Sequence, residues 1–306
     1  MQDHHDSGNP VEAVITSFNQ GSMILEAVRS LCAQTKLPQR IVIVDDGSTD
    51  ESSLHVLKSI ENSPDFPVPI MVHHRENGGV SSARNAGIRK TQAPMVLVLD
   101  GDDRLEPKYI ESVSALLRGH PSMVAASSWM HTFGVLDSVV RPAGGTIRSF
   151  LSHNCCPATH ILRREAFERC GGYDESMRSG FEDWEFFLSL LETLPESSIG
   201  IVEKPLINYR TAPSSSNVKS MSKRLELMRY MIEKHRDSYH RDLVDALLGI
   251  EAISGARLYG WENEMKHSIA NRQELSKASH EFLKSPTYGD GGMASAVRVV
   301  SFKKEC

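Results

Sequence analysis

Short apolar runs alternate with helical stripes along the first half of the chain. The apolar runs, which we interpret as β-strands, lie at residues 11–16, 41–44, 70–72, 95–99 and 123–126. Between the first two runs, Ile24, Ala27 and Leu31 recur at three- and four-residue steps, as in a helix that packs on a sheet. Strand–helix–strand units cross over with a right hand, so the loops after these strands meet at one edge. The pattern predicts an α/β fold with a mostly parallel sheet flanked by helices.

The loop after the run at 95–99 is the most acidic of these. Asp100, Asp102 and Asp103 surround Gly101 directly after the strand. In open α/β sheets, ligands bind at the carboxyl ends of the strands, and carboxylates that lie close together favour a divalent cation. We expect Gly101 to let the chain turn tightly, so that Asp100 and Asp102 face the same volume. The alternative for an isolated triplet is a polar loop that caps the next helix.

Two further loops at this edge carry candidate ligand-binding residues. Asp45 and Asp46 follow the second strand. Ser48 and Glu51 have the spacing of a capping box for the next helix, which leaves the two aspartates free to face a ligand. After the third strand, a glycine-containing loop opens a helix from which Arg84 can reach an anionic or carbonyl group. The alternative for Arg84 is an exposed surface arginine.

Four segments together resemble the family 2 glycosyltransferases, in order and in approximate spacing. They are Thr-Ser-Phe-Asn at 16–19, Asp-Asp-Gly-Ser-Thr-Asp at 45–50, the segment from Asn-Gly-Gly to Ala-Arg-Asn-Ala-Gly at 77–87, and Asp-Gly-Asp-Asp at 100–103. The resemblance covers roughly residues 11–216. It implies the GT-A fold, a Rossmann-like sheet, and a nucleotide-sugar donor, usually a UDP-sugar, bound with Mn²⁺ or Mg²⁺. Asp102 would be the metal ligand, and Asp100 would hold the metal or the ribose.

The resemblance also implies a nucleotide-sugar site. Its residues would be Thr16, Phe18, Asp45, Asp46, Arg84, Asp100 and Gly101. Thr16 and Phe18 would lie against the base and ribose, and Asp45 would accept a hydrogen bond from the uracil imide. Arg84 would contact the base or the diphosphate. Many relatives carry tyrosine in place of Phe18, so this chain keeps the stacking surface but lacks a hydroxyl group.

The second half of the predicted sheet domain contains one further acidic motif. Glu182 and Asp183 lie in the first turn of a predicted helix whose apolar residues face inward. Carboxylates at this place compensate the helix dipole, which is the ordinary interpretation of such a pair. The resemblance implies instead that the pair belongs to the acceptor site and that Asp183 is the catalytic base. The base would deprotonate an acceptor hydroxyl, which attacks the anomeric carbon opposite the diphosphate and inverts its configuration.

The end of this half departs from the family at one position. Tyr209 and Arg210, followed by three serines at 214–216, resemble a segment that folds over the diphosphate. Many relatives have a histidine two residues after the arginine, where this chain has Ala212. If that histidine helps to hold the metal or the diphosphate, this loop binds differently here.

From about residue 220 the pattern changes to long helical stretches, of which the first is basic. Its basic residues are Lys223, Arg224, Arg229, Lys234, Arg236 and Arg241. A basic amphipathic stretch at 220–241 is typical of contact with an anionic membrane surface or a lipid-linked acceptor. The alternative is a helical cap docked on the sheet domain. We predict a disordered tail at 1–10, a GT-A domain at 11–216 with a nucleotide-binding half at 11–128 and an acceptor half at 129–216, and a mainly helical C-terminal extension at 217–306.

Composition narrows the class of protein. The 306-residue chain has a net charge of −5, whereas general nucleic-acid binding requires a basic surplus. No apolar run is long enough to cross a bilayer, and the N-terminus lacks the regions of a signal peptide. We therefore expect a cytoplasmic protein, with any membrane contact at the inner face. The five cysteines form no C-x-x-C pair, so we expect free thiols and no zinc site.

These features together predict a metal-dependent inverting glycosyltransferase of the hexosyl or N-acetylhexosaminyl type, with a glycan, lipid-linked or other hydroxyl acceptor. Two alternatives stay open. A sugar-phosphate nucleotidyltransferase shares a Rossmann-like sheet and an acidic metal loop, but residues 17–21 are neither glycine-rich nor basic, as its triphosphate loop would be. A binding protein that has lost catalysis would keep the nucleotide pocket, and a turnover measurement distinguishes it.

Overall fold

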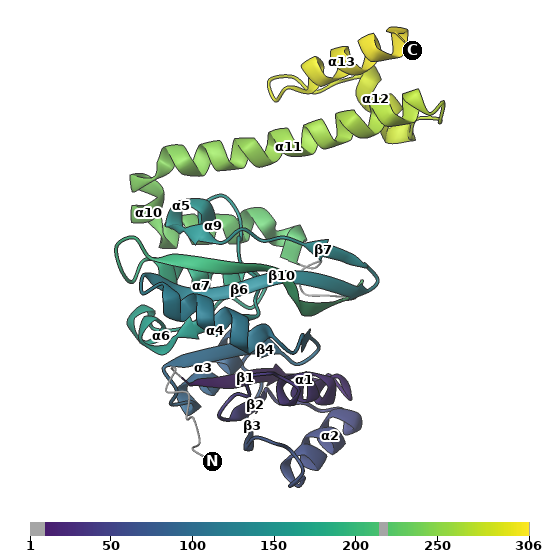
Figure 1. The fold of residues 1–306 in the computed structure, drawn as a ribbon. Helices are drawn as coiled ribbons and strands as arrows, with labels where there is room; N and C mark the ends of the chain where they lie inside the picture. The colour runs from purple at the N-terminus through teal and green to yellow at the C-terminus, as the bar shows by residue number, and fades with distance from the viewer. Residues whose placement is uncertain (1–9, 214–219, 306) are drawn as a thin grey trace. The chain divides into compact units, whose positions relative to one another are not determined.

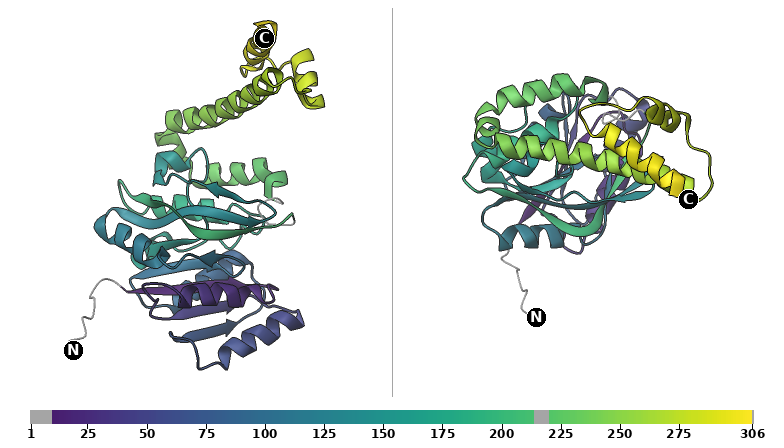
Figure 2. Two further views of the ribbon diagram at one scale, coloured as in Figure 1. Left: turned by 45° about the vertical axis from the view of Figure 1, so that its right-hand side comes forward. Right: turned by 90° about the horizontal axis from the view of Figure 1, so that it is seen from above.

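The computed structural model describes residues 10–213 and 220–305. Its contacts divide the chain into two compact units, Met1–Asp242 and Leu243–Cys306. Figures 1 and 2 show the elements of both units. The C-terminal extension was predicted to begin at residue 217. The junction between the two units lies later, after Asp242, because the helices up to residue 241 belong to the first unit. The predicted tail lies, apart from Pro10, outside the described residues.

A mixed sheet forms the centre of the first unit, with the strand order β3-β2-β1-β4-β9-β6-β10-β5, β7 beside β6 and β8 beside β10 (Figure 1). The strands are β1 Val11–Ser17, β2 Ile41–Asp45, β3 Ile70–His74, β4 Met95–Asp100, β5 Arg104–Leu105, β6 Met123–Gly134, β7 Ser138–Val140, β8 Gly145–Thr146, β9 His160–Arg163 and β10 Ser198–Thr211. β3, β2, β1 and β4 pair in parallel, as the apolar runs predicted. β9 is antiparallel to β4 and β6, and β6 is parallel to β10. The carboxyl ends of β1, β2, β4 and β10 therefore point the same way.

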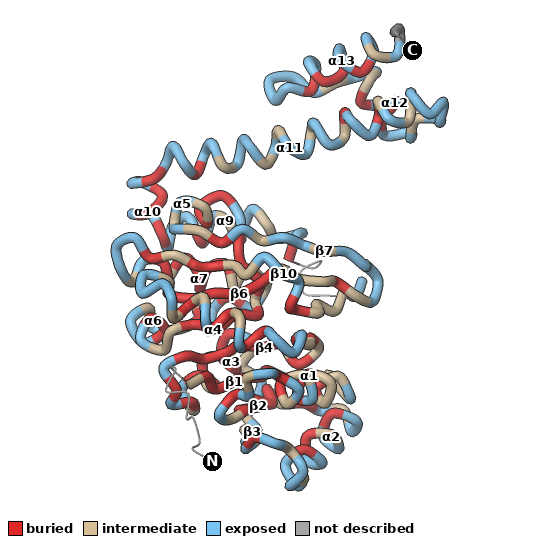
Figure 3. Tube along the Cα trace, viewed as in Figure 1, coloured by how far each residue is buried: buried red, intermediate tan, exposed pale blue. Residues whose placement is uncertain are grey.

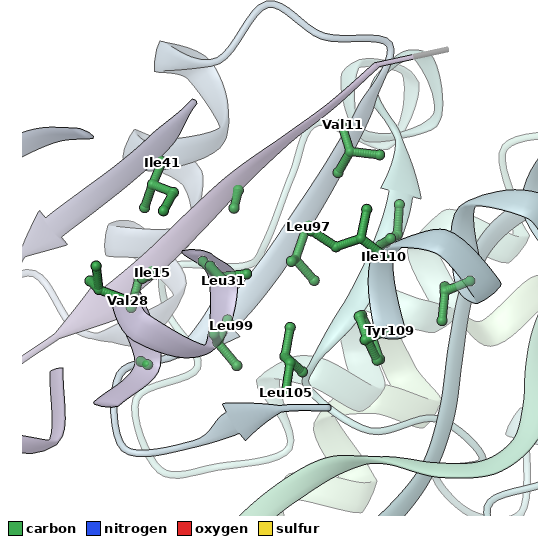
Figure 4. Packing of buried hydrophobic residues seen from close by; sticks show 14 of the residues in the cluster. Val11, Ile15, Val28, Leu31, Ile41, Leu97, Leu99, Leu105, Tyr109 and Ile110 are labelled. Atoms are coloured by element: carbon green, nitrogen blue, oxygen red, sulfur yellow. The ribbon is translucent and has the colours of Figure 1, made fainter. Parts of the chain in front are cut away.

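Helices cover both faces of the sheet. Those of the first unit are α1 Met23–Cys32, α2 Glu51–Glu61, α3 Val80–Lys90, α4 Tyr109–Gly119, α5 Ile147–Phe150, α6 Arg164–Cys170, α7 Glu182–Leu191, the 3₁₀-helix η1 Met221–Lys223, α9 Arg224–Lys234 and α10 Arg236–Arg241. α1, α2 and α4 pack on the face that carries Ile15 and Leu97, which Figure 4 shows close by. α3 packs on the opposite face, where Gly87 lies against Val14 and Val44. The central strands are thus buried on both faces, as Figure 3 shows.

The N-terminus of α2 differs from the prediction. Asp50 is its N-cap, and the Asp50 side chain accepts a hydrogen bond of 2.8 Å from the Ser53 amide. Ser48 instead accepts a 3.0 Å bond from the amide of Asn19 in the loop after β1. The predicted capping box of Ser48 and Glu51 is therefore wrong. Three neighbouring residues of this loop are good N-caps, and the tertiary contact to Asn19 decides which of them serves.

The basic stretch after residue 220 is docked on the first unit. Leu227 and Met231 of α9 are buried, and the Tyr239 hydroxyl of α10 donates a 2.9 Å hydrogen bond to the Leu151 carbonyl. Lys234 pairs with two acidic side chains of the same unit. These contacts support the helical-cap interpretation, and membrane contact stays a prediction.

The second unit is helical, as predicted. It consists of α11 Leu243–Ala270, α12 Lys277–Lys284 and α13 Gly292–Glu305. Its core gathers Met265, Phe282, Ala296 and Val299, and the rings of Trp261 and Phe282 lie 4.5 Å apart. Although α11 has 28 residues, no helix in the described part of the chain combines the length and the apolar content that spanning a bilayer requires.

The cysteines form no crosslinks in the described part of the chain. Cys32, Cys155, Cys156 and Cys170 are free thiols, which confirms the prediction for these four. Cys306 lies outside the described residues.

Candidate active site

The strand register brings residues from distant motifs to one edge of the sheet. Thr16 of β1 is the register partner of Asp100 on β4, and Ser17 is the partner of Asp45 on β2. The Thr16 hydroxyl donates a 3.2 Å hydrogen bond to Asp100 Oδ1. Because all three strands are parallel and end here, the predicted nucleotide-site residues Thr16, Asp45 and Asp100 converge.

Arg84 joins the two halves of the sheet domain. One of its terminal nitrogens, Nη2, donates to Asp100 Oδ1 at 2.8 Å and to Oδ2 at 3.0 Å, and Nη1 donates to Glu182 Oε1 at 3.3 Å. The side chain is only 2% exposed, so the alternative of a surface arginine is wrong. The neighbouring carboxylates raise the pKa of Arg84 against the effect of its burial, which keeps it charged. A buried guanidinium thus ties β4 to α7.

Asp102 and Asp103 form the turn after Asp100. Burial and the charge of Asp100 raise the pKa of Asp102 to about 6. Burial and the charges of Asp102 and Asp100 raise the pKa of Asp103 well above the usual carboxyl range. Asp103 Oδ1 accepts a 2.8 Å bond from the Arg210 amide, and Arg210 Nε donates to the Asp102 carbonyl at 3.0 Å. Arg210 therefore fixes this turn to the end of β10.

The acidic turn would need a bound ligand to complete a site for a divalent cation. Its carboxylates repel one another, and a cation between them would favour their ionised forms. Among residues 10–213 and 220–305, no three His, Cys, Asp or Glu side chains are placed to hold a metal together. A cation at Asp100 and Asp102 would thus have at most two carboxylate ligands, which is how Mg²⁺ binds when substrate phosphates supply further oxygens.

Gly101 is required by close approach to β1. Its amide donates a 3.0 Å bond to the Thr16 carbonyl, and a Cβ built on Gly101 would lie 2.8 Å from that oxygen. The Gln20 side chain fills the same space and its Nε2 lies 3.5 Å from Asp102 Oδ1. Only glycine therefore lets the acidic turn pack on the loop after β1.

Both oxygens of Asp45 and of Asp46 already accept hydrogen bonds from within the chain, which the sequence analysis did not predict, although each Asp45 oxygen keeps a second lone pair for a ligand. Asp45 Oδ1 accepts a 3.0 Å bond from the Ser48 amide, and its Oδ2 lies 2.8 Å from His74 Nδ1. Both oxygens of Asp46 accept backbone amides, from Gly78 at 3.0 Å and from Gly79 at 2.7 Å. Buried carboxylates require hydrogen-bond partners, and here backbone amides and the His74 side chain supply them.

The loop after β1 presents Phe18 to solvent. Phe18 is 49% exposed, as a ring that stacks on a ligand would be before binding. Asn19 beside it has a positive φ of 52°, and its side chain accepts a 2.8 Å bond from the Thr49 amide. This bond ties the Phe18 loop to the loop that carries Asp45.

Glu182 and Asp183 lie in the first turn of α7, as predicted. The residue before them, Phe181, has a left-handed φ of 63°, an uncommon conformation that clusters at functional sites. Asp183 Oδ2 accepts a 3.0 Å bond from Asn154 Nδ2, and Oδ1 accepts a 2.8 Å bond from the Trp184 amide. Burial and the charge of Glu182 raise the pKa of Asp183, while Arg84 acts in the opposite direction. The helix dipole alone would lower that pKa, so burial and the charge of Glu182 outweigh the dipole at this carboxyl group.

Three side chains of the site carried no sequence signal. Asn154 contacts Asp183, His74 contacts Asp45, and Gln20 lies against Gly101. None of the three was singled out by a motif, and only the tertiary fold brings each to its partner. Residues 214–216 of the predicted segment over the diphosphate lie outside the described residues.

The fold and the acidic edge define a GT-A glycosyltransferase architecture, and comparison with known proteins identifies the family. The profile described as Glycosyl transferase family 2 matches residues 12–171, just over half of the chain. The chain therefore belongs to this family. The matched region ends before Glu182 and Asp183.

Individual relatives agree with this family. An uncharacterized glycosyltransferase of Haemophilus influenzae is 26% identical over 187 residues, which are 58% of this chain and 61% of that protein. Glycosyltransferase GlyA of Streptococcus pneumoniae is 26% identical over 304 residues, 87% of this chain and 42% of its own length. The chain thus spans less than two thirds of the length of each of these two relatives.

Solved structures share the fold. The crystal structure of S. aureus TarS 1–349 in complex with UDP-GlcNAc matches with a TM-score of 0.59 and 18% identity, covering 77% of this chain and 72% of that one. The complex with UDP matches with a TM-score of 0.55 and 20% identity, covering 73% of this chain and 65% of that one.

Proposed function

We propose that the chain is a metal-dependent inverting glycosyltransferase that moves a sugar from a UDP-sugar to a hydroxyl of a saccharide or lipid-linked acceptor. Family membership supports sugar transfer. The UDP-GlcNAc complex of TarS supports a uridine nucleotide as carrier. An N-acetylglucosaminyltransferase of Azorhizobium caulinodans, 32% identical over 111 residues (35% of this chain, 27% of its own length), supports a hexosyl or N-acetylhexosaminyl donor.

One observation carries this proposal: Arg84 bonds Asp100 and Glu182 together. Asp100 ends the strand of the predicted donor site, and Glu182 precedes Asp183 on α7. The bridge joins the two halves of the domain, which supports a base on α7 that acts on a donor bound at the acidic turn. Transfer between a donor and an acceptor requires this juxtaposition, whereas a nucleotide-binding protein does not.

Asp183 would act as the base. Its raised pKa makes it a stronger proton acceptor than an ordinary carboxylate, which suits deprotonation of a sugar hydroxyl near neutral pH. Asn154 holds one of its oxygens by a hydrogen bond and thereby orients the carboxylate. As the C–O bond to the acceptor forms, its proton would pass to Asp183 and the bond to the diphosphate would break, with inversion at the anomeric carbon.

The donor would lie along the edge formed by the loops after β1, β2 and β4. Phe18 would stack on the base, Thr16 would lie against the ribose, and Asp45 would accept from the uracil imide. Arg84 would hold Asp100 and Glu182 in place and would contact the base or the diphosphate. Asp102, with Asp100, would hold Mn²⁺ or Mg²⁺, which when bound neutralises charge on the leaving diphosphate.

A panel of nucleotide sugars tests this proposal. The purified chain is heated with UDP-, GDP- and dTDP-sugars, with Mn²⁺ or with chelator, and the midpoint of unfolding is measured. A ligand that binds only the folded state raises the midpoint, and 100-fold excess over Kd stabilises by about 2.7 kcal/mol. We expect a UDP-sugar with Mn²⁺ to give the largest shift and then to be turned over to UDP. A panel in which no nucleotide sugar stabilises the chain would contradict the proposal, and stabilisation without turnover, with saccharide acceptors present, would indicate a binding protein.

A further inference from the structure

The inference concerns Lys234, which lies beyond the family match and contacts two segments of the site. Its Nζ lies 2.6 Å from Asp174 Oδ2 and 2.8 Å from Glu185 Oε1. Asp174 belongs to the loop after α6, and Glu185 belongs to α7. Lys234 ends α9, so one ammonium group joins three segments. Tyr230, one turn earlier, donates a 2.6 Å bond from its hydroxyl to the same oxygen of Asp174.

The two segments that Lys234 joins also enclose Arg84. The Tyr173 ring, next to Asp174, lies with its centroid 5.4 Å from Arg84 Cζ. Glu182, one turn before Glu185, bonds the same guanidinium. Tyr173 in turn stacks on Phe186 of α7, with ring centroids 3.7 Å apart. The loop and α7 therefore pack around Arg84, whose place at the sheet edge is fixed separately by its two bonds to Asp100.

The charges explain why this spacing depends on Lys234. Glu185 is fully buried, and Asp174 is close enough that both carboxylates share one ammonium group. Without that cation, the two carboxylates would repel each other, and His235, 3.2 Å from Glu185, would remain as the cation beside it. Removal of one partner of a buried pair leaves an uncompensated charge, and separation of the loop from α7 would relieve it.

We infer that Lys234 is a positioning residue of the active site: it holds the loop at 171–175 and α7 together, so that Asp183 faces the donor edge. The inference rests on the proposed function of that site. The donor edge itself is built by β1, β2 and β4 and does not contact Lys234. A shift of α7 would therefore slow transfer while donor binding persists, and a misplacement of about 1 Å at a reacting group can lower a rate about 100-fold.

Lys234→Met tests the inference, because methionine keeps the apolar stem and removes the charge. We expect kcat to fall at least tenfold, while the Kd for the nucleotide sugar changes less than threefold. Lys234→Arg keeps the charge and should restore most of kcat. Arg229→Met, an exposed change on the same helix, controls for the loss of one positive charge. Ser238→Ala controls for lost stability, since its hydroxyl bonds Glu192 at the opposite end of α7.

Hydrogen exchange of residues 173–186 provides a readout that does not need turnover. We expect faster exchange in Lys234→Met than in Ser238→Ala. Unchanged kcat in a folded Lys234→Met enzyme, or losses of kcat and donor affinity of equal size, would overturn the inference. If the parent turns over no nucleotide sugar, the proposed function fails separately. The exchange comparison then decides, since faster exchange supports the positioning role and unchanged exchange overturns it.

Discussion

Arg84 binds both carboxylate oxygens of Asp100 through one guanidinium nitrogen, at 2.8 and 3.0 Å. The Arg84 side chain is buried, and its ion pair with Asp100 joins α3 to the end of β4. The second terminal nitrogen of Arg84 bonds Glu182, so the two halves of the sheet domain share one cation.

Asp102→Asn should impair metal-dependent donor binding. Burial and Asp100 raise the pKa of Asp102, and a divalent cation is expected to relieve that repulsion. We expect the stabilisation by UDP with Mn²⁺, measured by thermal unfolding, to fall strongly. Turnover should fall with it. The exposed Asp137→Asn is the matched control. Full activity of Asp102→Asn in excess chelator would exclude the metal role.

Asp45→Ala should weaken UDP more than inorganic diphosphate. A carboxylate that accepts from a base N–H contributes only to ligands that carry the base, and loss of such a bond costs about 1–3 kcal/mol. Titration calorimetry with both ligands measures the difference. The exposed Asp65→Ala should change neither affinity. Equal losses for both ligands would contradict a base-reading role for Asp45.

Gly87→Ala should destabilise the first unit, although alanine is normally the better helix residue. A Cβ at Gly87 would lie 2.9 Å from Val44 Cγ2 and closer still to Val14. Such overpacking costs about 1–3 kcal/mol in the free energy of unfolding. Gly255→Ala in α11, where a Cβ meets nothing within 4 Å, should stabilise its unit by up to about 1 kcal/mol. Urea unfolding compares the two variants, and a Gly87→Ala protein as stable as the parent would contradict the packing of α3.

Stability should depend on pH through His235. Hydrogen bonds to Glu185 and Glu192 raise the pKa of His235 from 6.5 to about 9, although burial opposes the shift. Because the folded pKa lies above the unfolded one, this contribution is complete below pH 6.5 and is lost as pH rises through about 9. The shift corresponds to at most about 3 kcal/mol.

His235→Gln isolates that contribution. The difference in the free energy of unfolding between parent and variant should be largest near pH 6 and should shrink towards pH 10. Urea unfolding at several pH values measures it. A difference that is constant across this range would show that His235 does not change its proton affinity on folding.

The sequence predicted the edge of the sheet better than the contacts across it. Apolar runs that end in Asp45 and Asp100 locate the carboxyl ends of parallel strands, because a run buried on both faces has no other place in this fold. The partners of Asp46 and Asp183 could not be predicted. They come from Gly78, Gly79 and Asn154, which lie about 30 residues away in loops whose meeting depends on the strand order.

The error at the start of α2 has the same physical origin. Ser48 and Asp50 have similar intrinsic preference for the N-cap. The hydrogen bond from the Asn19 amide to Ser48 decides which of the two serves as the N-cap. Asn19 lies in the loop after β1, so a local sequence pattern does not include it. The strand directions in the second half of the sheet could not be predicted from local sequence patterns either. β9 lies antiparallel between β4 and β6, and its apolar pattern fits either strand direction.

The rate of Asp183→Asn tests the central claim most directly. The substitution keeps the size of the side chain and removes its ability to accept the acceptor proton. If Asp183 is the base, kcat should fall at least about 100-fold while the affinities for the UDP-sugar and the metal stay within about threefold of the parent. If Asp183 only compensates the helix dipole, the variant should lose at most about 1 kcal/mol of stability and keep its turnover. A folded Asp183→Asn protein that binds the nucleotide sugar and transfers it at the parent rate would contradict the mechanism.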